Sequence, residues 1–248
     1  MSKPYQDLVT WARVVLDLAY PRNCPVCQTA LDEADRGVIC RICLGQVKFI
    51  EPPFCEQCAL PYAGQVTGET FRCGYCHGRF FNFSRAVAAV RAEGVGRAAI
   101  HLLKYHGAQY VVPHLAEWLV MAGRRWVDWS AADVIVPVPL YPRKERARGF
   151  NQARLLAEAL GAAVGKPVLS RAVRRVKDTA TQTKLGREER ARNLRGAFAV
   201  RQVAAVTGQR VVLVDDVFTT GVTLDSCARV LRNAGAADVV ALTVARGT

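Results

Sequence analysis

Eight of the nine cysteines form four Cys-x-x-Cys pairs, separated by 12, 11 and 14 residues. Each pair can turn two thiolates toward one ion, and two pairs complete the Cys₄ tetrahedron that structural zinc prefers. The spacing therefore predicts two structural zinc ions. It favours pairing of consecutive units, giving two successive ribbons, and leaves an interleaved cross-brace open. The pairs are Cys24/Cys27, Cys40/Cys43, Cys55/Cys58 and Cys73/Cys76.

The stretch 210–224 places carboxylates, threonines and a glycine directly after an apolar run. The run 211–214 is predicted to be a strand with Asp215 and Asp216 at its carboxyl end, where open α/β sheets bind ligands. The threonine-rich loop around Gly221 leads into a helix, and a helix N-terminus attracts phosphate through its free amides. The carboxylates would repel that phosphate, so sugar hydroxyls or a divalent cation are their natural partners. The pattern calls for a ligand with a phosphate beside a diol.

This stretch resembles the signature of type I phosphoribosyltransferases. The resemblance implies that the acidic pair holds the ribose hydroxyls of phosphoribosyl diphosphate together with Mg²⁺, while the loop cradles the 5-phosphate. It implies a catalytic role for Asp215 and Asp216. The ligand-binding residues that it implies are Asp215, Asp216, Val217, Thr219, Thr220, Gly221, Thr223, Pro139 and Leu140.

Together with the cysteine pairs, the segments 136–152 and 179–193 narrow the resemblance to the ComF family of competence-associated proteins. By the fold resemblance, 136–152 stands in place of the pyrophosphate loop. Arg146 and Arg148 would there neutralise a leaving diphosphate, as catalytic residues, because guanidinium groups suit bidentate contacts. The basic stretch 174–195 stands in place of a flexible catalytic lid, and a solvated basic helix is the alternative.

The net charge of +13 is concentrated in one region of the chain. Residues 139–201 hold 16 Lys or Arg and 5 Asp or Glu, so 16 minus 5 gives +11. Such an excess predicts an anionic ligand or a polyanionic partner. Single-stranded DNA is one such partner, with Phe150 and Tyr141 available to stack on bases. The arginines assigned to its backbone are Arg146, Arg148 and Arg187.

Three functions stay open at this point. The chain could transfer a phosphoribosyl group to an acceptor that the sequence does not identify, because no base-binding motif is recognisable. It could use the fold to bind single-stranded DNA during uptake, with competence or helicase proteins as partners. It could also sense phosphoribosyl diphosphate without turnover.

Strand-length and helix-length segments alternate from residue 83 onward. This alternation predicts an α/β domain with a mostly parallel sheet flanked by helices, the type I phosphoribosyltransferase fold, preceded by a small zinc-ribbon module. Cys227 is expected in the core, and Lys104, His101 and His106 receive no role. Predicted strands are 86–90, 134–140, 168–174, 211–214 and 239–244; predicted helices are 95–105, 114–125, 151–164, 187–194 and 223–233.

The chain is expected to divide into an N-terminal amphipathic helix (1–20), a double zinc ribbon (21–80) and a phosphoribosyltransferase-like domain (81–248). Asp17 interrupts the apolar run of the first segment, so neither a signal peptide nor a membrane span is predicted. We therefore expect a cytoplasmic protein with reduced thiols. Because structural zinc is coupled to folding, a chelator should unfold 24–76 and leave the α/β domain largely intact.

Overall fold

The structure is a computed structural model that describes residues 22–35, 37–64, 66, 71–178, 194 and 196–247. The predicted N-terminal helix lies outside these residues, as do Arg187 and most of the predicted lid and of the helix predicted at 187–194. The chain forms two compact units, Met1–Val47 and Lys48–Thr248. The division falls within the stretch predicted as the double zinc ribbon, so each unit contains one cysteine cluster.

The described part of the first unit is a small cysteine-centred fold. Its helix is α2, Arg41–Gly45, and Cys40 caps that helix by accepting a hydrogen bond from the amide of Cys43. An isolated antiparallel bridge joins Asn23 and Ala30. Besides the cysteines, the buried apolar side chains described here are Ile39 and Val47, and so small a core is typical of folds that a metal or another cross-link stabilises.

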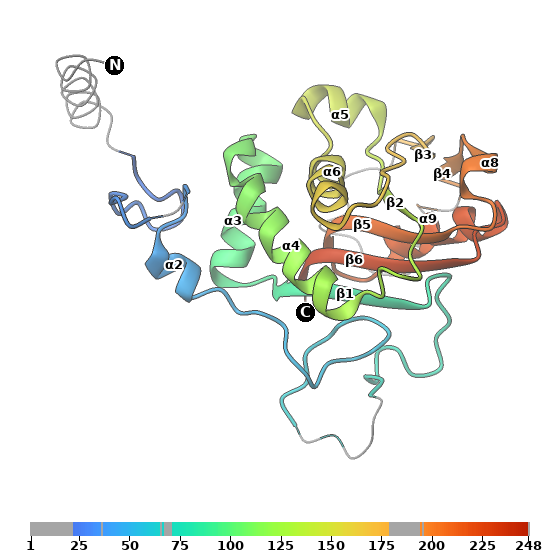
Figure 1. Ribbon diagram of the computed structural model, residues 1–248, viewed down its shortest axis with the longest axis horizontal. Coiled ribbons are helices and arrows are strands. Elements are labelled where there is room, and N and C mark those ends of the chain that lie inside the picture. The colour runs from blue at the N-terminus through green and yellow to red at the C-terminus, as the bar shows by residue number, and fades with distance from the viewer. Residues whose placement is uncertain are drawn as a thin grey trace. The chain divides into compact units, whose positions relative to one another are not determined.

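Within the described residues, the second unit is built on a four-stranded sheet in the order β1-β6-β5-β2 (Figure 1). Each neighbouring pair of strands is parallel, which confirms the predicted sheet. The strands are apolar and largely buried, as expected where helices cover both faces of a parallel sheet. The strands are β1 (Arg85–Arg91), β2 (Val134–Pro137), β5 (Arg210–Phe218) and β6 (Asp238–Arg246).

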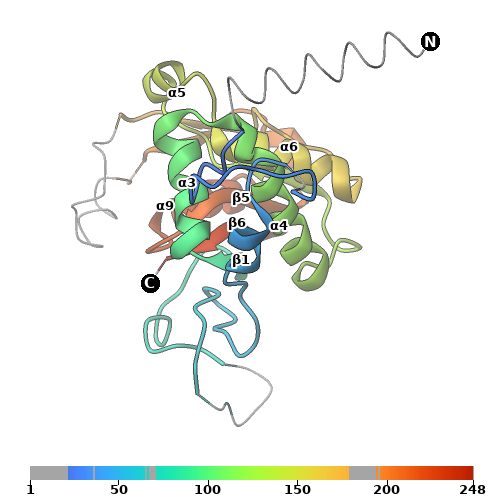
Figure 2. The ribbon, with the colours of Figure 1, turned by 90° about the vertical axis from the view of Figure 1, so that its left-hand side faces the viewer.

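Helices cover the sheet on its two faces. α4 and α6 pack side by side on one face, and α9 packs against β5, β6 and the strand β4 on the other (Figures 1 and 2). The helices of this unit are α3 (Gly94–His106), α4 (Val112–Trp126), α5 (Pro142–Arg148), α6 (Gln152–Val164), α8 (Val203–Val206) and α9 (Val222–Asn233), with the short 3-10 turn η1 (Gln109–Val111) before α4. Among the residues described, no helix combines the length and apolar character needed to span a bilayer.

The strand β5 extends further than the apolar run predicted. Its backbone stays paired with β6 through the acidic residues, with Asp215 opposite Thr243 and Phe218 opposite Arg246. The two carboxylates therefore lie within the strand and not in the loop after it. Because side chains alternate along a strand, Asp215 and Asp216 point to opposite faces of the sheet.

Two further segments differ from the prediction. The segment after β2 contains the helix α5, which begins with Pro142 and ends at Gly149 in the left-handed conformation, with a φ of 84°. None of its residues is buried, so it has no apolar stripe by which to predict it. The predicted strand 168–174 joins the four-stranded sheet only through a bridge from Val168 to Ile135. The strand β3 (Val173–Arg175) instead pairs antiparallel with β4 (Phe198–Val200).

Candidate functional site

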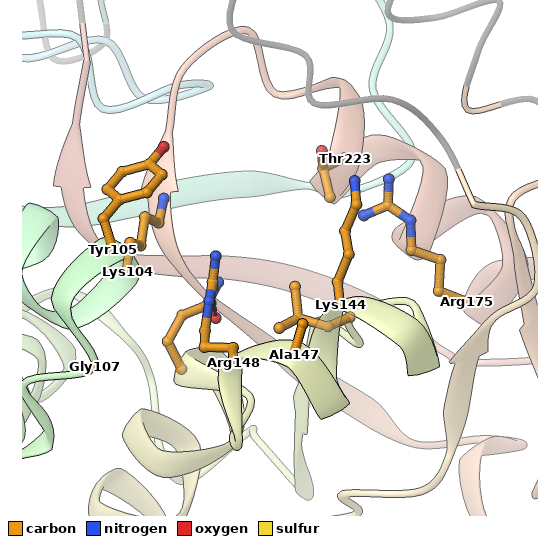
Figure 3. A pocket seen from close by; sticks show the side chains of 10 residues that line it. Lys104, Tyr105, Gly107, Lys144, Ala147, Arg148, Arg175 and Thr223 are labelled. Atoms are coloured by element: carbon orange, nitrogen blue, oxygen red, sulfur yellow. Dashed lines mark hydrogen bonds between the residues drawn. The ribbon is translucent and has the colours of Figure 1, made fainter.

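A pocket of about 650 Å³ opens where the carboxyl ends of the strands meet α3, α5 and the start of α9 (Figure 3). This is the edge at which open α/β sheets bind ligands. Three of the predicted site residues line it: Leu140, Arg148 and Thr223. Other side chains that line the pocket have no role predicted from the sequence, among them Lys104, Tyr105, Lys144 and Arg175.

Asp216 is buried beneath this pocket and forms an ion pair with Lys104. Its side chain is 4% exposed, and its Oδ2 lies 2.8 Å from the Lys104 ammonium nitrogen. Burial opposes the charge of Lys104, but the Asp216 and Asp215 carboxylates outweigh this effect and raise the pKa of Lys104. Lys104, expected only at the surface or in packing, is thus a charged component of the site. Its position near the end of α3 gives no sequence signal of this contact.

Asp215 faces the other side of the sheet, toward Cys227 of α9 and Arg175 of β3, with which it interacts electrostatically. Its Oδ1 accepts a hydrogen bond from the Asp216 amide at 2.9 Å. Desolvation and the neighbouring Asp216 carboxylate raise the pKa of Asp215 to about 8. Cys227 is fully buried, which confirms its predicted place in the core.

Cationic side chains from two further elements point into the pocket. Lys144 and Arg148 come from α5 and Arg175 from β3, and in Figure 3 the ends of Lys144 and Arg175 turn toward Thr223. Burial, with repulsion by Arg175 and other guanidinium groups, lowers the pKa of Lys144. An anion in the pocket would relieve that repulsion. Arg148 also donates to Gln152 Oε1 at 2.5 Å.

Other predicted residues lie elsewhere. Arg146 is exposed and lines a separate hollow with Pro142, Glu145 and Gly149. Phe150 is 3% exposed, so the expectation that it stacks on bases is wrong: this side chain fills the core. Pro139 precedes the pocket-lining Leu140 and is half-buried.

The predicted phosphate loop, 219–221, joins β5 to α9. Gly221 is the N-cap residue of α9 and has a φ of 75°, and no side chain caps this helix. A Cβ at this position would lie 2.6 Å from Phe218 Cζ, so both conformation and space require glycine. The first amides of a helix have no intrahelical acceptor, and here they adjoin the cationic pocket at Thr223.

The eight predicted cysteines form two clusters by consecutive pairing, and the structure does not interleave them. Within each cluster the Sγ atoms all lie within 4.8 Å of one another. A zinc–sulfur distance near 2.3 Å requires tetrahedral edges of about 3.8 Å. The Sγ separations of 3.6 Å between Cys27 and Cys40 and 3.7 Å between Cys58 and Cys73 match that edge, so both clusters fit a zinc ion.

Backbone amides support the sulfurs of both clusters. The amide of Cys40 donates to Cys24 Sγ at 3.4 Å, and the amide of Cys73 donates to Cys55 Sγ at 3.3 Å. Gln28 and Ala59, which directly follow the first pair of each cluster, have positive φ values of 66° and 56°. Non-glycine residues take this conformation only where the surrounding turn imposes it.

The second cluster is part of the core of the larger unit. Cys55, Cys58, Cys73 and Cys76 pack in one hydrophobic cluster with residues of β5, β6 and α9. Because of this packing, we expect a chelator to affect the α/β domain as well, whereas the sequence alone predicts that this domain stays largely intact.

Comparison with known proteins defines the class of this chain. Residues 102–247 match the phosphoribosyl transferase domain, and residues 15–77 match the double zinc ribbon domain. It is therefore a phosphoribosyltransferase-fold protein with an N-terminal double zinc ribbon.

The chain belongs to the ComF family. It is 35% identical over 225 residues to DNA utilization protein YhgH of Salmonella typhimurium, covering 90% of this chain and 96% of that protein. It is 32% identical over 230 residues to competence protein F of Haemophilus influenzae, covering 90% and 96%. It is 37% identical over 114 residues to competence protein ComFC of Bacillus subtilis, covering 46% and 44%.

Proposed function

We propose that this protein binds phosphoribosyl diphosphate in the pocket at the carboxyl edge of the sheet. The observation that supports this most directly is the arrangement around Thr223. The start of α9 adjoins the cationic side chains that line the pocket, and Asp216 forms an ion pair with Lys104 at the same edge of the sheet. The helix start suits the 5-phosphate, the cations Lys144, Arg148 and Arg175 suit the diphosphate, and the carboxylates suit the ribose hydroxyls.

Magnesium fits this arrangement as part of the ligand. Asp216 already has Lys104 as a counterion, whereas burial and the neighbouring Asp216 carboxylate raise the pKa of Asp215, which a cation would lower. Mg²⁺ prefers one or two carboxylates together with substrate phosphates. Asp215 and the diphosphate oxygens would hold the ion, which would neutralise charge on the diphosphate.

Calorimetry with the full chain, Mg²⁺ and phosphoribosyl diphosphate tests this proposal. Asp216→Asn keeps the size of the side chain and removes a charge-assisted hydrogen bond, which should weaken binding about ten- to a hundredfold. Asp238→Asn is the matched control, because Asp238 is at the amino end of β6, on the opposite edge of the sheet. Equal affinity in wild type and a folded Asp216→Asn variant would refute the proposed site.

Turnover is a separate part of the proposal. In an active phosphoribosyltransferase, an acceptor nucleophile would form a bond to the anomeric carbon as the bond from that carbon to the diphosphate breaks. The pocket-lining guanidinium groups of Arg148 and Arg175 would stabilise the departing diphosphate. A sensor of phosphoribosyl diphosphate would bind without cleaving. Exchange of labelled diphosphate into the bound ligand distinguishes the two, because only an enzyme that forms an oxocarbenium-like state can reverse the cleavage.

We further propose that the chain takes part in DNA utilisation or competence by binding single-stranded DNA. Two relatives are named for competence and one for DNA utilization, and residues 139–201 have a charge of +11 from 16 basic and 5 acidic residues. Binding to a phosphate backbone should weaken steeply as salt rises. The triple variant Arg146→Ala, Arg148→Ala, Arg187→Ala should flatten that dependence. If single-stranded DNA does not bind even at low salt, this function is refuted. The basic residues would then serve only to bind the diphosphate.

A further inference from the structure

The second cysteine cluster directly contacts the loop that the proposed function assigns to the 5-phosphate. Tyr75 lies between Cys73 and Cys76, and its hydroxyl donates a hydrogen bond to the carbonyl of Thr220 at 2.8 Å. The side chain is half-buried and packs against the hydrophobic core. A residue within a metal-binding turn therefore holds the backbone of the phosphate loop.

Arg246, the last residue of β6, makes a second connection between the same two places. Its Nε donates to the carbonyl of Cys58 at 2.8 Å, and its Nη2 lies 3.7 Å from Cys58 Sγ. Its Nη1 donates to the carbonyls of Thr219 at 3.0 Å and Phe218 at 3.3 Å. The residue is 4% exposed, and its guanidinium stacks over the Phe218 ring at 4.7 Å. This fork of donors fixes cluster and loop relative to each other.

These contacts determine which way the peptide groups of the loop point. Arg246 and Tyr75 hold the carbonyls of Phe218, Thr219 and Thr220, three successive residues. In a planar trans peptide the N–H points opposite to the C=O. The amides of the residues that follow each carbonyl therefore point away from the cysteine cluster. Successive amides on one side of a loop form an anion-binding concavity.

The segment that follows the cluster also holds the start of α9. The amide and Nδ2 of Asn82 donate to Asp225 Oδ1 at 2.6 and 2.9 Å, and Asp225 lies in the first turn of that helix. Phe83 packs edge-on against Phe218, with ring centroids 6.1 Å apart. Loop, helix start and cysteine cluster thus form one packed body.

We infer that Tyr75 and Arg246 are positioning residues through which zinc binding at Cys55, Cys58, Cys73 and Cys76 orders the phosphate loop. The inference rests on the proposed function, because it concerns the same phosphate-binding loop. Four sulfurs held by one ion fix the turns that contain Cys58 and Tyr75. Linkage makes the effect reciprocal: the zinc raises affinity for the phosphate, and the bound phosphate retains the zinc.

Zinc release from the full chain to a chromogenic chelator tests the reciprocal effect, with ribose 5-phosphate as the probe. The probe should slow release from the second cluster about fivefold or more and leave the first cluster unchanged. Cys27→Ser, in the first cluster, assigns the two release phases and serves as the matched control. This cluster belongs to the other compact unit, so its loss should leave the affinity for ribose 5-phosphate unchanged.

Two conservative variants test whether Tyr75 and Arg246 couple the second zinc site to the phosphate loop. Tyr75→Phe removes one hydroxyl and should weaken ribose 5-phosphate about three- to tenfold in calorimetry. Arg246→Lys keeps the charge but not the fork of donors. Both variants should bind zinc and melt cooperatively, yet the probe should protect the second zinc less than in wild type. If Arg246→Lys fails to fold, Tyr75→Phe alone decides.

The outcomes separate the inference from the function on which it rests. If wild-type protein binds ribose 5-phosphate but neither zinc is retained more strongly, the inference fails and the proposed function stands. If the probe protects the second zinc equally in wild type and in Tyr75→Phe, the coupling does not pass through this hydroxyl and the inference fails. If neither ribose 5-phosphate nor phosphoribosyl diphosphate binds wild type, the proposed function and the inference both fail.

Discussion

The ammonium nitrogen of Lys104 lies 2.8 Å from Oδ2 of Asp216, beneath the pocket at the carboxyl edge of the sheet. Because of this ion pair, Asp215 and Asp216 are in different electrostatic environments. Asp216 has a direct counterion on α3, whereas Asp215 faces α9 and has a pKa raised to about 8. The two carboxylates are therefore in different electrostatic environments: Asp216 has a counterion, and burial raises the pKa of Asp215.

Replacing Lys104 with Met should destabilise the protein. The buried Asp216 carboxylate would lose its counterion, and breaking a buried pair in this way costs about 3 kcal/mol. We use the lower end of the range for broken buried ion pairs, because the Lys104 side chain is 24% exposed and solvent weakens the interaction. Urea unfolding monitored by circular dichroism measures the change.

The double variant Lys104→Met, Asp216→Asn is the control for this pair. Removing both charges should recover most of the lost free energy of unfolding, because no unpaired ion remains. Additive losses in the two single variants would show that the 2.8 Å contact contributes no coupling energy.

Asp215 should make the protein less stable as the pH rises. Its pKa is about 8 in the folded chain, above the ordinary value of about 4, so the folded state binds the extra proton between these limits. The protonated Asp215 carboxyl therefore contributes stability at acid pH, and this contribution is lost as the pH rises toward 8. Asp215→Asn cannot ionise and should become increasingly more stable than wild type over the same range.

Denaturant unfolding of both proteins at about pH 5 and about pH 9 measures the difference. Subtracting the free energy of unfolding of one protein from that of the other cancels the contributions of all other titrating groups. Parallel pH profiles for wild type and Asp215→Asn would mean that the Asp215 carboxylate is solvated and titrates normally.

Much of the site could be predicted from local sequence. Consecutive Cys-x-x-Cys pairs favoured the clusters that form, because each turn converges on its nearest neighbour. The run 211–214 located the central strand β5, and the residues after it located the carboxyl edge. Each of these features is predicted from residues that are close together in the sequence, so contacts between distant segments are not needed to find it.

The contacts that complete the site join distant segments and leave no local signal. Lys104 lies on an ordinary amphipathic helix, and only the sheet topology brings it to Asp216. Arg246 looks like a terminal basic residue, yet strand pairing buries it against Cys58 and Phe218. The helix α5 was missed for a different reason: it has no buried face, and only its initial proline and final glycine mark it.

The two zinc sites should differ in their effect on stability. Elemental analysis should find about two zinc ions per chain. Cys27→Ser should lose one ion and leave the unfolding of the larger unit unchanged. Cys55→Ser should also lose one ion, but it should lower the stability of that unit by about 3 kcal/mol or more, because the second cluster is part of its core.

Differential scanning calorimetry and zinc analysis of the same samples compare the two variants. Equal melting of the larger unit in Cys55→Ser and wild type would show that its core does not depend on the second ion. Release of both ions by Cys27→Ser would contradict the consecutive pairing of the clusters.

Gly221 and Thr223 should respond to substitution in different ways, although both belong to the predicted phosphate site. Gly221→Ala places a Cβ 2.6 Å from Phe218 Cζ at a φ of 75°, so it should destabilise the fold by about 1–3 kcal/mol as well as weaken binding.

Thr223→Val keeps the shape of the side chain and loses one pocket-lining hydroxyl. It should melt like wild type and bind ribose 5-phosphate about three- to tenfold more weakly. Calorimetry and thermal melting of both variants separate loop strain from phosphate contact. Wild-type affinity in Thr223→Val would remove this hydroxyl from the site, and wild-type stability in Gly221→Ala would mean that the loop can open without cost.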